Sequence, residues 1–460
     1  MDGFFRLAER LADVVRKWDD ILVVGHYDAD GITSTAILVS ALRSLGKEVR
    51  FVNLKQLYSD ELDRVADAGE YFIFADMGVG QLPLLRERLE KPFIILDHHQ
   101  IPPGEDYPLL LHPHIFGMDG AREISGAGVA YALYRALTGK TDMAHVAVVG
   151  AVGDVQLVGN QLVGFNREVL LRDAIASGKL FAYRDLALYG RASRPLPYMF
   201  LYSSDPILPG LTANEEAVFD FLRSAGIEYV RDGVWRHYVD LSEDERRRLF
   251  SELAVYLSRV GWSEERILRL IGEVYELSGE DRHSPLFDVR EYATLLNACG
   301  RHGQPEIGVE VALGDRDEWY RKALHLLSEH REALRRGIEW VERSGLDELP
   351  HLYYFHARDA IPPSLVGIVA GMLYGSGIVP ADRPIVGFAY DEGEYVKVSA
   401  RASGDLVRKG VDLSVAVRRA AEAVGGEAGG HKPAAGARIR RGEEEEFLRA
   451  LDEEIGKQIT

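Results

Sequence analysis

Short apolar runs alternate with helix-periodic stretches over the first hundred residues. The runs are ILVVGH, VRFVNL, YFIFAD and FIILDHH. A helical pattern over Phe4–Trp18 leads into the first run, and further helical stretches separate the runs: Ile32–Ser44, a short helix before YFIFAD and the segment LPLLRERLE. Such alternation predicts an α/β fold, with a mostly parallel sheet covered by helices on both faces. Helical patterns over Gly126–Leu137 and Met143–Gly153 extend this domain.

The middle of the chain has a different pattern. A stretch rich in Pro and Ser, Arg191–Gly210, interrupts the alternation. Helical periodicity with a charged face then runs over Asn214–Leu277, which predicts a small helical module. A second break, SGEDRHSPLFD, precedes the helical segment REYATLLNACG and a long charged helix over Glu318–Ser344.

Alternation returns in the last part of the chain and predicts a second α/β domain. Its apolar runs are HLYYFHA, PIVGFAY and YVKVSAR, followed by a helix over Leu413–Val424, a glycine-rich loop and ARIR. The apolar stretch Pro363–Pro380 contains four glycines, so we expect a buried helix plus a turn rather than a membrane span. The predicted parts are residues 1–200, 205–280, 281–345 and 346–460.

Composition narrows the function classes. The net charge of −18 argues against a general nucleic-acid coating protein, although cations or one basic groove can still serve a nucleic-acid enzyme. The single cysteine, Cys299, excludes an internal disulfide and a cysteine-based metal site. Together with a charged N-terminus unlike a signal peptide, this favours a cytoplasmic protein.

Three of the apolar runs end in residues that bind metals. His26, Asp28 and Asp30 follow the first run, Asp76 follows the third, and the fourth leads into Asp97-His98-His99. Because parallel strands deliver their carboxyl ends to one edge of a sheet, these side chains are expected to converge there. Alternation also points the first three the same way in an extended segment.

Each of these residues has an ordinary alternative explanation. A single Asp at a strand end is more often a helix cap, the Asp-His-His segment alone can be a plain loop, and the Gly-Asp pair ending at Asp154 is nearly uninformative. The combination is different, because clustered carboxylates repel one another unless cations neutralise them. Mixed His and carboxylate ligands suit Mn²⁺, with Mg²⁺ as the alternative, and six ligands suit two ions ~4 Å apart.

These motifs resemble one known family. HYDADG, ADMG, DHH and GD, in this order on an α/β sheet, resemble the DHH phosphoesterases, and Gly429–Gly436 resembles the glycine–histidine motif of their companion DHHA1 domain. The segment Leu295–Arg301 is similar to archaeal RecJ-like nucleases, the group that includes the GINS-associated nuclease. The resemblance implies a DHH catalytic domain, a small helical insertion, connecting helices and a C-terminal DHHA1 substrate-binding domain.

The resemblance also implies a role for each motif residue. His26 and Asp28 would bind one Mn²⁺, Asp76 would bridge, and the second ion would be bound by Asp30, His98 and Asp154. Asp97 would orient the histidines, and His99 would contact the scissile phosphate as a ligand or proton donor. Many RecJ proteins have Asp at the position of His26, which changes the ligand set of the first ion.

Substrate contacts are implied in the second α/β domain, where Arg401, Gly430 and His431 would face the cluster across a cleft. Arg offers a planar fork to phosphate, and glycine lets the backbone approach closely. Asn297 and Arg301 are weaker candidates, and a capping role explains Asn297 equally well. Cys299 is expected in the core. The remaining aromatic candidates for base stacking are Tyr353, Tyr354, Phe181 and Tyr183.

Three functions follow from this interpretation. The first is an exonuclease that hydrolyses terminal phosphodiesters of single-stranded DNA or RNA to mononucleotides, in replication or repair. The second is a phosphoesterase for short oligonucleotides or cyclic dinucleotides. The third is a replisome scaffold subunit that docks on GINS or a helicase through the helical module. Single-stranded nucleic acid is the expected partner in the first case, and no membrane is expected in any of them.

Overall fold

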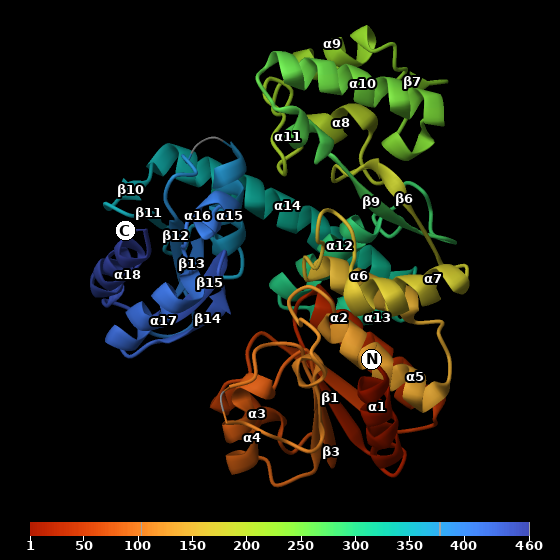
Figure 1. Cartoon of the computed structure of the whole chain (residues 1–460), viewed down its shortest axis with the longest axis vertical. Helices are drawn as coiled ribbons and strands as arrows, with labels where there is room; N and C mark the ends of the chain where they lie inside the picture. Colours follow the sequence, from red (N-terminus) through yellow and green to blue (C-terminus); the bar gives the residue numbers. More distant parts are fainter. Residues whose placement is uncertain (103, 377–378, 460) are drawn as a thin grey trace. The chain divides into compact units, whose positions relative to one another are not determined.

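The computed structural model describes residues 1–102, 104–376 and 379–459 (Figure 1). They form two units, which are described separately. One comprises residues 1–202 and 209–327, and the other comprises residues 203–208 and those from 328 onward.

The first unit is built on a five-stranded sheet with the strand order β2-β1-β3-β4-β5. All neighbouring strands in it are parallel. The strands are β1 (Ile21–His26), β2 (Val49–Leu54), β3 (Tyr71–Ala75), β4 (Phe93–Leu96) and β5 (Leu110–Leu111). This confirms the α/β class and the parallel sheet predicted from the apolar runs.

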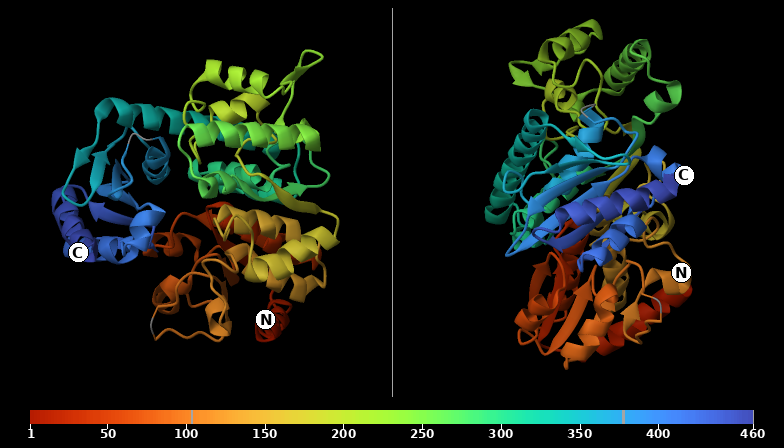
Figure 2. Two further views of the ribbon diagram at one scale, coloured as in Figure 1. Left: turned by 45° about the horizontal axis from the view of Figure 1, so that its top comes forward. Right: turned by 90° about the vertical axis from the view of Figure 1, so that its left-hand side faces the viewer.

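Helices cover both faces of this sheet because successive strand residues point to opposite sides. Ile21 and Val23 pack into one hydrophobic core, and the intervening Leu22 and Val24 pack into another. The first core contains α1 (Asp2–Val15), α2 (Ala29–Ser44), α5 (Gly126–Thr138), α6 (Ala144–Gly153), α12 (Val289–Arg301) and α13 (Pro305–Ala312). The second core contains α3 (Ser59–Val65) and α4 (Leu82–Arg88) (Figures 1 and 2).

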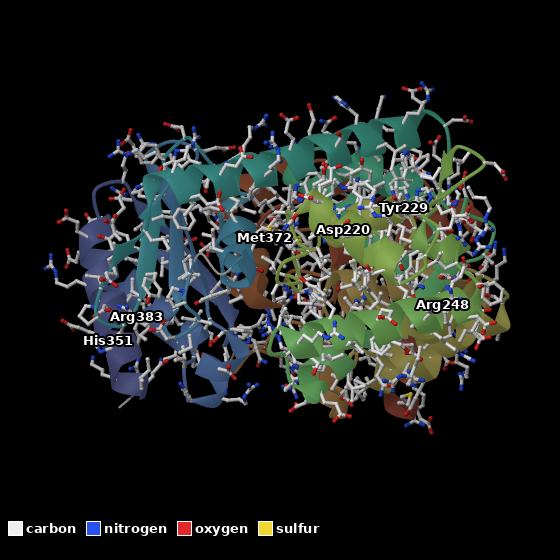
Figure 3. All side chains as sticks on the ribbon, turned by 90° about the horizontal axis from the view of Figure 1, so that it is seen from above. Asp220, Tyr229, Arg248, His351, Met372 and Arg383 are labelled. Carbon is white, nitrogen blue, oxygen red and sulfur yellow. The ribbon has the colours of Figure 1, made fainter. Side chains whose placement is uncertain are left out.

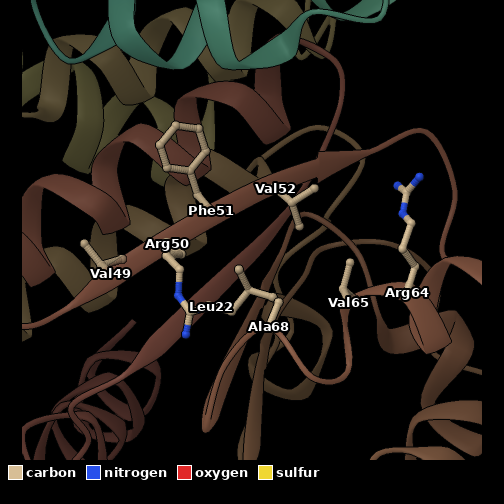
Figure 4. Close-up of a pocket in the computed structure, with 8 residues that line it drawn as sticks. All are labelled: Leu22, Val49, Arg50, Phe51, Val52, Arg64, Val65 and Ala68. Carbon is tan, nitrogen blue, oxygen red and sulfur yellow. The ribbon is translucent and has the colours of Figure 1, made fainter.

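A hollow of about 610 Å³ lies beside the edge strand β2 (Figure 4). Its lining is mainly apolar, and its two charged members, Arg50 and Arg64, are paired with Asp20 and Glu61. None of the predicted site residues lines it. It is therefore an open sheet edge rather than the place where the chemistry occurs.

The region after α6 combines helices with a small antiparallel sheet. Its elements are η3 (Asn166–Leu171), α7 (Arg172–Ala176), β6 (Leu180–Leu186), α8 (Leu196–Leu201), α9 (Glu215–Ser224), β7 (Val230–Arg231), β8 (Val234–Trp235), η4 (Tyr238–Asp240), α10 (Glu243–Arg259), α11 (Glu264–Leu268) and β9 (Ile271–Leu277). The prediction of a helix continuing to Leu277 was wrong, since β9 pairs with β6. The 84 residues 187–270 separate the two strands, and this long-range pairing stabilises an extended segment that local periodicity alone favours as helix.

A buried arginine joins this sheet to α12. The Arg191 guanidinium is 1% exposed and contacts Asp185 at 2.9 Å and Asp288 at 3.2 Å. On α12, the Glu291 carboxylate accepts hydrogen bonds from the backbone N–H groups of Ala192 and Ser193. A buried charge is tolerated only when it is paired in this way, so these contacts fix the start of the helical module.

The second unit contains a six-stranded sheet with the order β10-β11-β12-β13-β15-β14. Its strands are β10 (Asp347–Glu348), β11 (Tyr353–His356), β12 (Ile385–Tyr390), β13 (Tyr395–Arg401), β14 (Glu427–His431) and β15 (Ala434–Arg440). Its helices are the later part of α14 (Glu318–Ser344), α15 (Val366–Ser376), α16 (Gly404–Arg408), α17 (Leu413–Ala423) and α18 (Glu444–Ile459). The helices α16, α17 and α18 share one core with the sheet, and α14 and α15 share the other.

Two predictions for this unit need comment. The glycine-rich stretch expected as a loop is mostly the edge strand β14, because its backbone pairs with β15. The helix expected within Pro363–Pro380 is α15, and part of the turn expected after it, residues 377–378, lies outside the described residues. Across the described part of the chain, no helix combines the length and the apolar character needed to cross a bilayer.

Polar contacts around the start of β11 connect it to β12 and to the last helix (Figure 3 labels Arg383 and His351). Arg383 donates to the Leu349 carbonyl at 2.8 Å, and its guanidinium lies over the Tyr353 ring. The backbone N–H of His351 donates to Asp452 of α18 at 2.8 Å. The last helix is therefore anchored to the sheet as well as packed on it.

Candidate metal centre

The first ligand group lies where β1 ends and α2 begins. Asp28 is the N-cap of α2, and its carboxylate accepts from the Gly31 N–H at 3.1 Å. Asp30 is 1% exposed and accepts from the N–H groups of Gly126 and Ala127, at 2.6 and 2.9 Å, which start α5. Both aspartates therefore do cap helices, Asp28 at the start of α2 and Asp30 at the start of α5. It leaves a second face of each carboxylate directed at its neighbours.

Asp76 follows β3 and is the central residue of the cluster. Its backbone has a left-handed φ of 60°, which is uncommon outside glycine and often marks functional positions. The Asp76 Oδ1 atom lies 3.0 Å from His98 Nε2, and its Oδ2 atom lies 3.6 Å from His26 Nδ1. One carboxylate thus contacts a histidine on each side.

The Asp-His-His segment follows β4, and its backbone and rings are held in place. His98 donates from Nδ1 to the Gly120 carbonyl at 2.6 Å, which directs Nε2 into the cluster. The Asp97 carboxylate accepts from the Val79 N–H and from the Nδ1 of His99, at 2.9 and 2.8 Å. Asp97 therefore orients His99 and does not itself point into the cluster, as expected for a supporting carboxylate.

Asp154 caps the C-terminus of α6 and completes the group, with Oδ2 3.8 Å from His98 Nε2. The buried amide of Gln156 donates to Asp154 at 2.8 Å and also to the Gly120 carbonyl. Asn166 donates in turn to Gln156 at 2.6 Å. Sequence reasoning missed Gln156 and Asn166, because no spacing or residue type marks them as supports of the site.

The six predicted ligands thus come together as two adjacent sets, which a third group of Asp76, His98 and His99 links. Each set has one histidine or carboxylate atom per residue within 4.8 Å of the others: His26, Asp28 and Asp76 in one, and Asp30, His98 and Asp154 in the other. The His26 Nδ1 and Asp76 Oδ1 atoms are buried and have no hydrogen bond among the described residues. Their near neighbours are other members of the cluster, with His26 Nδ1 3.0 Å from Asp28 Oδ2 and Asp76 Oδ1 3.0 Å from His98 Nε2, and they are the atoms that a cation would bind.

The protonation of the cluster reflects crowded negative charge. Burial, with repulsion from Asp76 and Asp154, raises the pKa of Asp30 well above its usual range. Burial also raises the pKa of Asp154, to about 6, against the favourable field of His98. Burial opposes a proton on His98, yet the surrounding carboxylates raise its pKa. Cations bound among these carboxylates would relieve this charge, and their binding would be coupled to the release of protons.

Helix α12 supports the first ligand loop through the motif at Leu295–Arg301. The Asn297 carbonyl oxygen accepts from the Ala29 N–H at 3.0 Å, so Asn297 caps α2 from a distant part of the chain. A Cβ on Gly300 would lie 1.7 Å from the Tyr27 carbonyl oxygen, so only glycine fits. Burial lowers the pKa of Arg301, partly offset by Tyr27 and Asp28. Cys299 is buried in the core of this unit, as expected.

The predicted substrate residues of the second unit lie at one end of its sheet. Arg401 of β13 and His431 of β14 both pair in register with Ala434 of β15. Directly opposed residues share a sheet face, so the two side chains leave the same face, one strand apart. Gly430 has a φ of +140°, and a Cβ there would lie 2.5 Å from Ala435 Cα. Their predicted placement opposite the cluster stays a prediction.

The aromatic candidates differ in exposure. Phe181 on β6 is 60% exposed, while the hydroxyl of Tyr183 on the same strand donates a hydrogen bond to the Glu276 carboxylate at 2.6 Å. Tyr353 on β11 is buried, and Tyr354 is partly buried. Their role in base stacking stays a prediction.

Family models match three parts of the chain. The DHH family N-terminal domain matches residues 20–152, the DHH-CID domain residues 188–271, and the DHHA1 domain residues 352–457. The six cluster residues fall in or just after the first match, and Arg401 and His431 fall in the third.

Relatives cover the chain to different extents. An uncharacterised protein of Methanocaldococcus jannaschii is 31% identical over 97% of this chain and 95% of its own length. The single-stranded-DNA-specific exonuclease RecJ of Thermus thermophilus is 35% identical over 38% of this chain, which spans 28% of that relative.

Solved structures share the fold at low identity. The Thermus thermophilus RecJ crystal structure with Mn²⁺ has a TM-score of 0.61 at 22% identity, covering 99% of this chain and 55% of that one. CDC45 of Entamoeba histolytica has a TM-score of 0.67 at 14% identity, covering 99% of both chains. The family matches and the near full-length relative show that the chain belongs to the DHH phosphoesterase family, in its RecJ-like branch.

Proposed function

We propose that this protein is a two-metal phosphodiesterase that removes mononucleotides from the end of single-stranded DNA or RNA. The observation that carries the proposal is the pair of adjacent ligand sets, with Asp76 in contact with a histidine of each. A structural cluster of this charge would cost stability without cations. Membership in the DHH phosphoesterases gives the reaction class, and the substrate is our inference.

In this proposal the two sets hold two divalent cations. His26 and Asp28 would hold one, Asp30, His98 and Asp154 would hold the other, and Asp76 lies where it could serve both. Two such ions polarise a phosphoryl group, lower the pKa of a nearby water and neutralise charge on the attacking and leaving oxygens. Mixed nitrogen and carboxylate ligands favour Mn²⁺ over Mg²⁺, and RecJ of Thermus thermophilus has been crystallised with each of them.

His99 and Asp97 act on the substrate side. The Nδ1 of His99 is bonded to Asp97, and the side chain is 44% exposed, so its Nε2 can reach a phosphate. Although burial opposes it, the Asp97 carboxylate raises the pKa of His99. A protonated ring can bind a phosphate oxygen or give its proton to the leaving oxygen. Asp97 fixes the ring and stabilises that charge.

The second unit supplies substrate contacts. Arg401 and His431 leave the same sheet face at one register position, and Gly430 allows close approach to the backbone there. Their spacing across one intervening strand is roughly 10 Å, so the two side chains suit adjacent phosphates of one strand. Asn297 acts indirectly in this scheme, by capping α2.

The direct test compares Asp28→Asn with Asp60→Asn. Asparagine keeps the cap on α2 but removes a charged ligand, whereas Asp60 is an exposed residue on α3. With Mn²⁺, the wild type and Asp60→Asn should shorten a labelled single-stranded 30-mer one nucleotide at a time, and Asp28→Asn should lose at least about 100-fold in rate.

The choice of substrate decides between the candidate activities. Single-stranded and duplex 30-mers, labelled at either end as DNA or RNA, should be compared with a dinucleotide and a cyclic dinucleotide. Preference for the single strand supports the exonuclease and gives its polarity. Cleavage of the small substrates alone would support the oligonucleotide or cyclic-dinucleotide phosphoesterase, and equal rates for Asp28→Asn and wild type would refute both.

A second role, docking on GINS or a helicase during replication, is favoured by the surface of the helical module. Val234 and Tyr202 are 66% and 57% exposed, and Trp235 stacks on Tyr229 at 6.1 Å between centroids (Figure 3 labels Tyr229). Exposed apolar residues gathered in this way often mark protein interfaces. Val234→Asp should abolish capture of purified GINS, and undiminished capture would exclude this surface.

A further inference from the structure

A second group of metal-type side chains lies away from the DHH cluster. His237 is the N-cap of η4 in the helical module and Asp240 is the last residue of η4, whereas His283 belongs to the segment between β9 and α12. Each offers one ligand atom, and these atoms lie within 4.8 Å of one another. The group shares no residue with the proposed catalytic centre.

The distances within this group suit a metal ion with nitrogen ligands. The His283 Nε2 atom lies 2.8 Å from Asp240 Oδ1, and the His237 Nδ1 atom lies 3.7 Å from Asp240 Oδ2. A tetrahedral ion with bonds of about 2.0–2.1 Å separates its ligand atoms by roughly 3.3 Å. The distances of 2.8 and 3.7 Å fall on either side of that value, so small side-chain rotations would let all three residues coordinate one ion.

Hydrogen bonding alone explains only part of the arrangement. One bond joins His283 to Asp240, whereas His237 Nδ1 is buried and lies 3.7 Å from the same carboxylate, beyond hydrogen-bond distance. The two imidazole rings stack with centroids 4.1 Å apart and planes 22° apart.

The backbone around the three residues is already fixed. The His237 N–H donates to Asp240 at 2.8 Å, and the His283 N–H donates to Asp281 at the same distance. The guanidinium of Arg282 reaches back to the Val239 carbonyl at 2.6 Å. Two segments 43 residues apart in the sequence thus meet with their ligand atoms preset. Little ordering entropy would be lost on metal binding.

We propose that His237, Asp240 and His283 form a second, structural site for a zinc-type cation, with water as the fourth ligand. Two nitrogens and one carboxylate oxygen suit Zn²⁺ better than Mg²⁺ or Ca²⁺. The ion would clamp the helical module to the segment that leads into α12. Because α12 carries Asn297, the clamp would also steady the helix that supports the catalytic loop. The proposal stands independently of the nuclease assignment.

The test measures bound zinc rather than activity. Chelator-treated wild type, His283→Ala, His237→Ala and the control His325→Ala, which removes an exposed histidine of α14, are incubated with zinc chloride, desalted and analysed by mass spectrometry for metal. The catalytic centre contributes the same zinc to all four proteins. Wild type and His325→Ala should therefore carry about one equivalent more than the other two variants.

Thermal melting gives a second readout. Zinc should raise the Tm of wild type and His325→Ala by more than it raises the Tm of His283→Ala. His283 is 45% exposed, so this variant should fold even if His237→Ala does not. Equal zinc content in wild type and His283→Ala would overturn the proposal, and so would equal zinc-induced shifts in their Tm.

Discussion

Adding one methyl group at Gly126 should disable the proposed metal centre. Gly126 begins α5, and a Cβ built on it would lie 2.5 Å from Asp76 Oδ1 and 2.6 Å from Asp76 Cβ. An unstrained contact needs roughly 3.3–3.5 Å, so the two groups must separate by about 0.8 Å. Metal–ligand distances tolerate only about ±0.2 Å. Either Asp76 retreats from its neighbours or α5 moves and loses its bond to Asp30.

The consequence can be measured as metal affinity. Displacing a supported ligand typically costs 10–100-fold in affinity, and we expect Gly126→Ala to lose at least that much for Mn²⁺ in calorimetric titration. Overpacking should also lower the free energy of unfolding by about 1–3 kcal/mol. The matched control is Gly80→Ala, where a Cβ meets no atom within 4 Å. Wild-type Mn²⁺ affinity in Gly126→Ala would refute the central position of Asp76.

Three further predictions concern two residues of α12, Asn297 and Glu291, and the divalent cations themselves. Asn297→Ala removes the acceptor for the Ala29 N–H, so it should lower the free energy of unfolding by about 1 kcal/mol and raise the Mn²⁺ concentration needed for half-maximal rate. Asn297→Asp keeps an acceptor and should restore both quantities. Equal behaviour of the two variants would contradict a capping role. Burial raises the pKa of Glu291 from near 4.5 to about 7. Between pH 4.5 and pH 7 the folded state therefore binds more protons than the unfolded state, and the free energy of unfolding should fall as the pH rises. The Tm of Glu291→Gln should depend less on pH in this window than the Tm of wild type, and an equal dependence would argue against a raised pKa. Removing divalent cations with a chelator should lower the Tm, and Mn²⁺ at 100 times its dissociation constant should restore about 2.7 kcal/mol; a Tm insensitive to both would speak against a cation site.

Much of the fold follows from local patterns in the sequence. The runs ILVVGH and FIILDHH are continuous apolar segments, as strands buried on both faces must be, and the structure places them in the parallel sheet. The helix predicted to reach Leu277 ended earlier because β9 is stabilised by β6, about ninety residues away. The glycines before His431 form an edge strand for the same reason. Pairing between distant strands leaves no local signal.

The candidate site shows the same division. The six ligand-type residues could be found because each follows a strand or helix end that topology brings to one edge. Their supports could not: Gln156 and Asn166 act through side-chain hydrogen bonds that no spacing encodes. Nor did the sequence show that Asp30 also caps α5. That second role makes Asp30→Ala a poor test of catalysis, because it also leaves buried N–H groups without an acceptor.

The central claim is that six side chains around Asp76 hold two cations. The most direct measurement is anomalous diffraction at the manganese edge from a crystal of the protein soaked in Mn²⁺. We predict two peaks about 4 Å apart, one beside His26 and Asp28 and the other beside Asp30, His98 and Asp154, with Asp76 between them. A single peak elsewhere, or none at this edge of the sheet, would contradict the account.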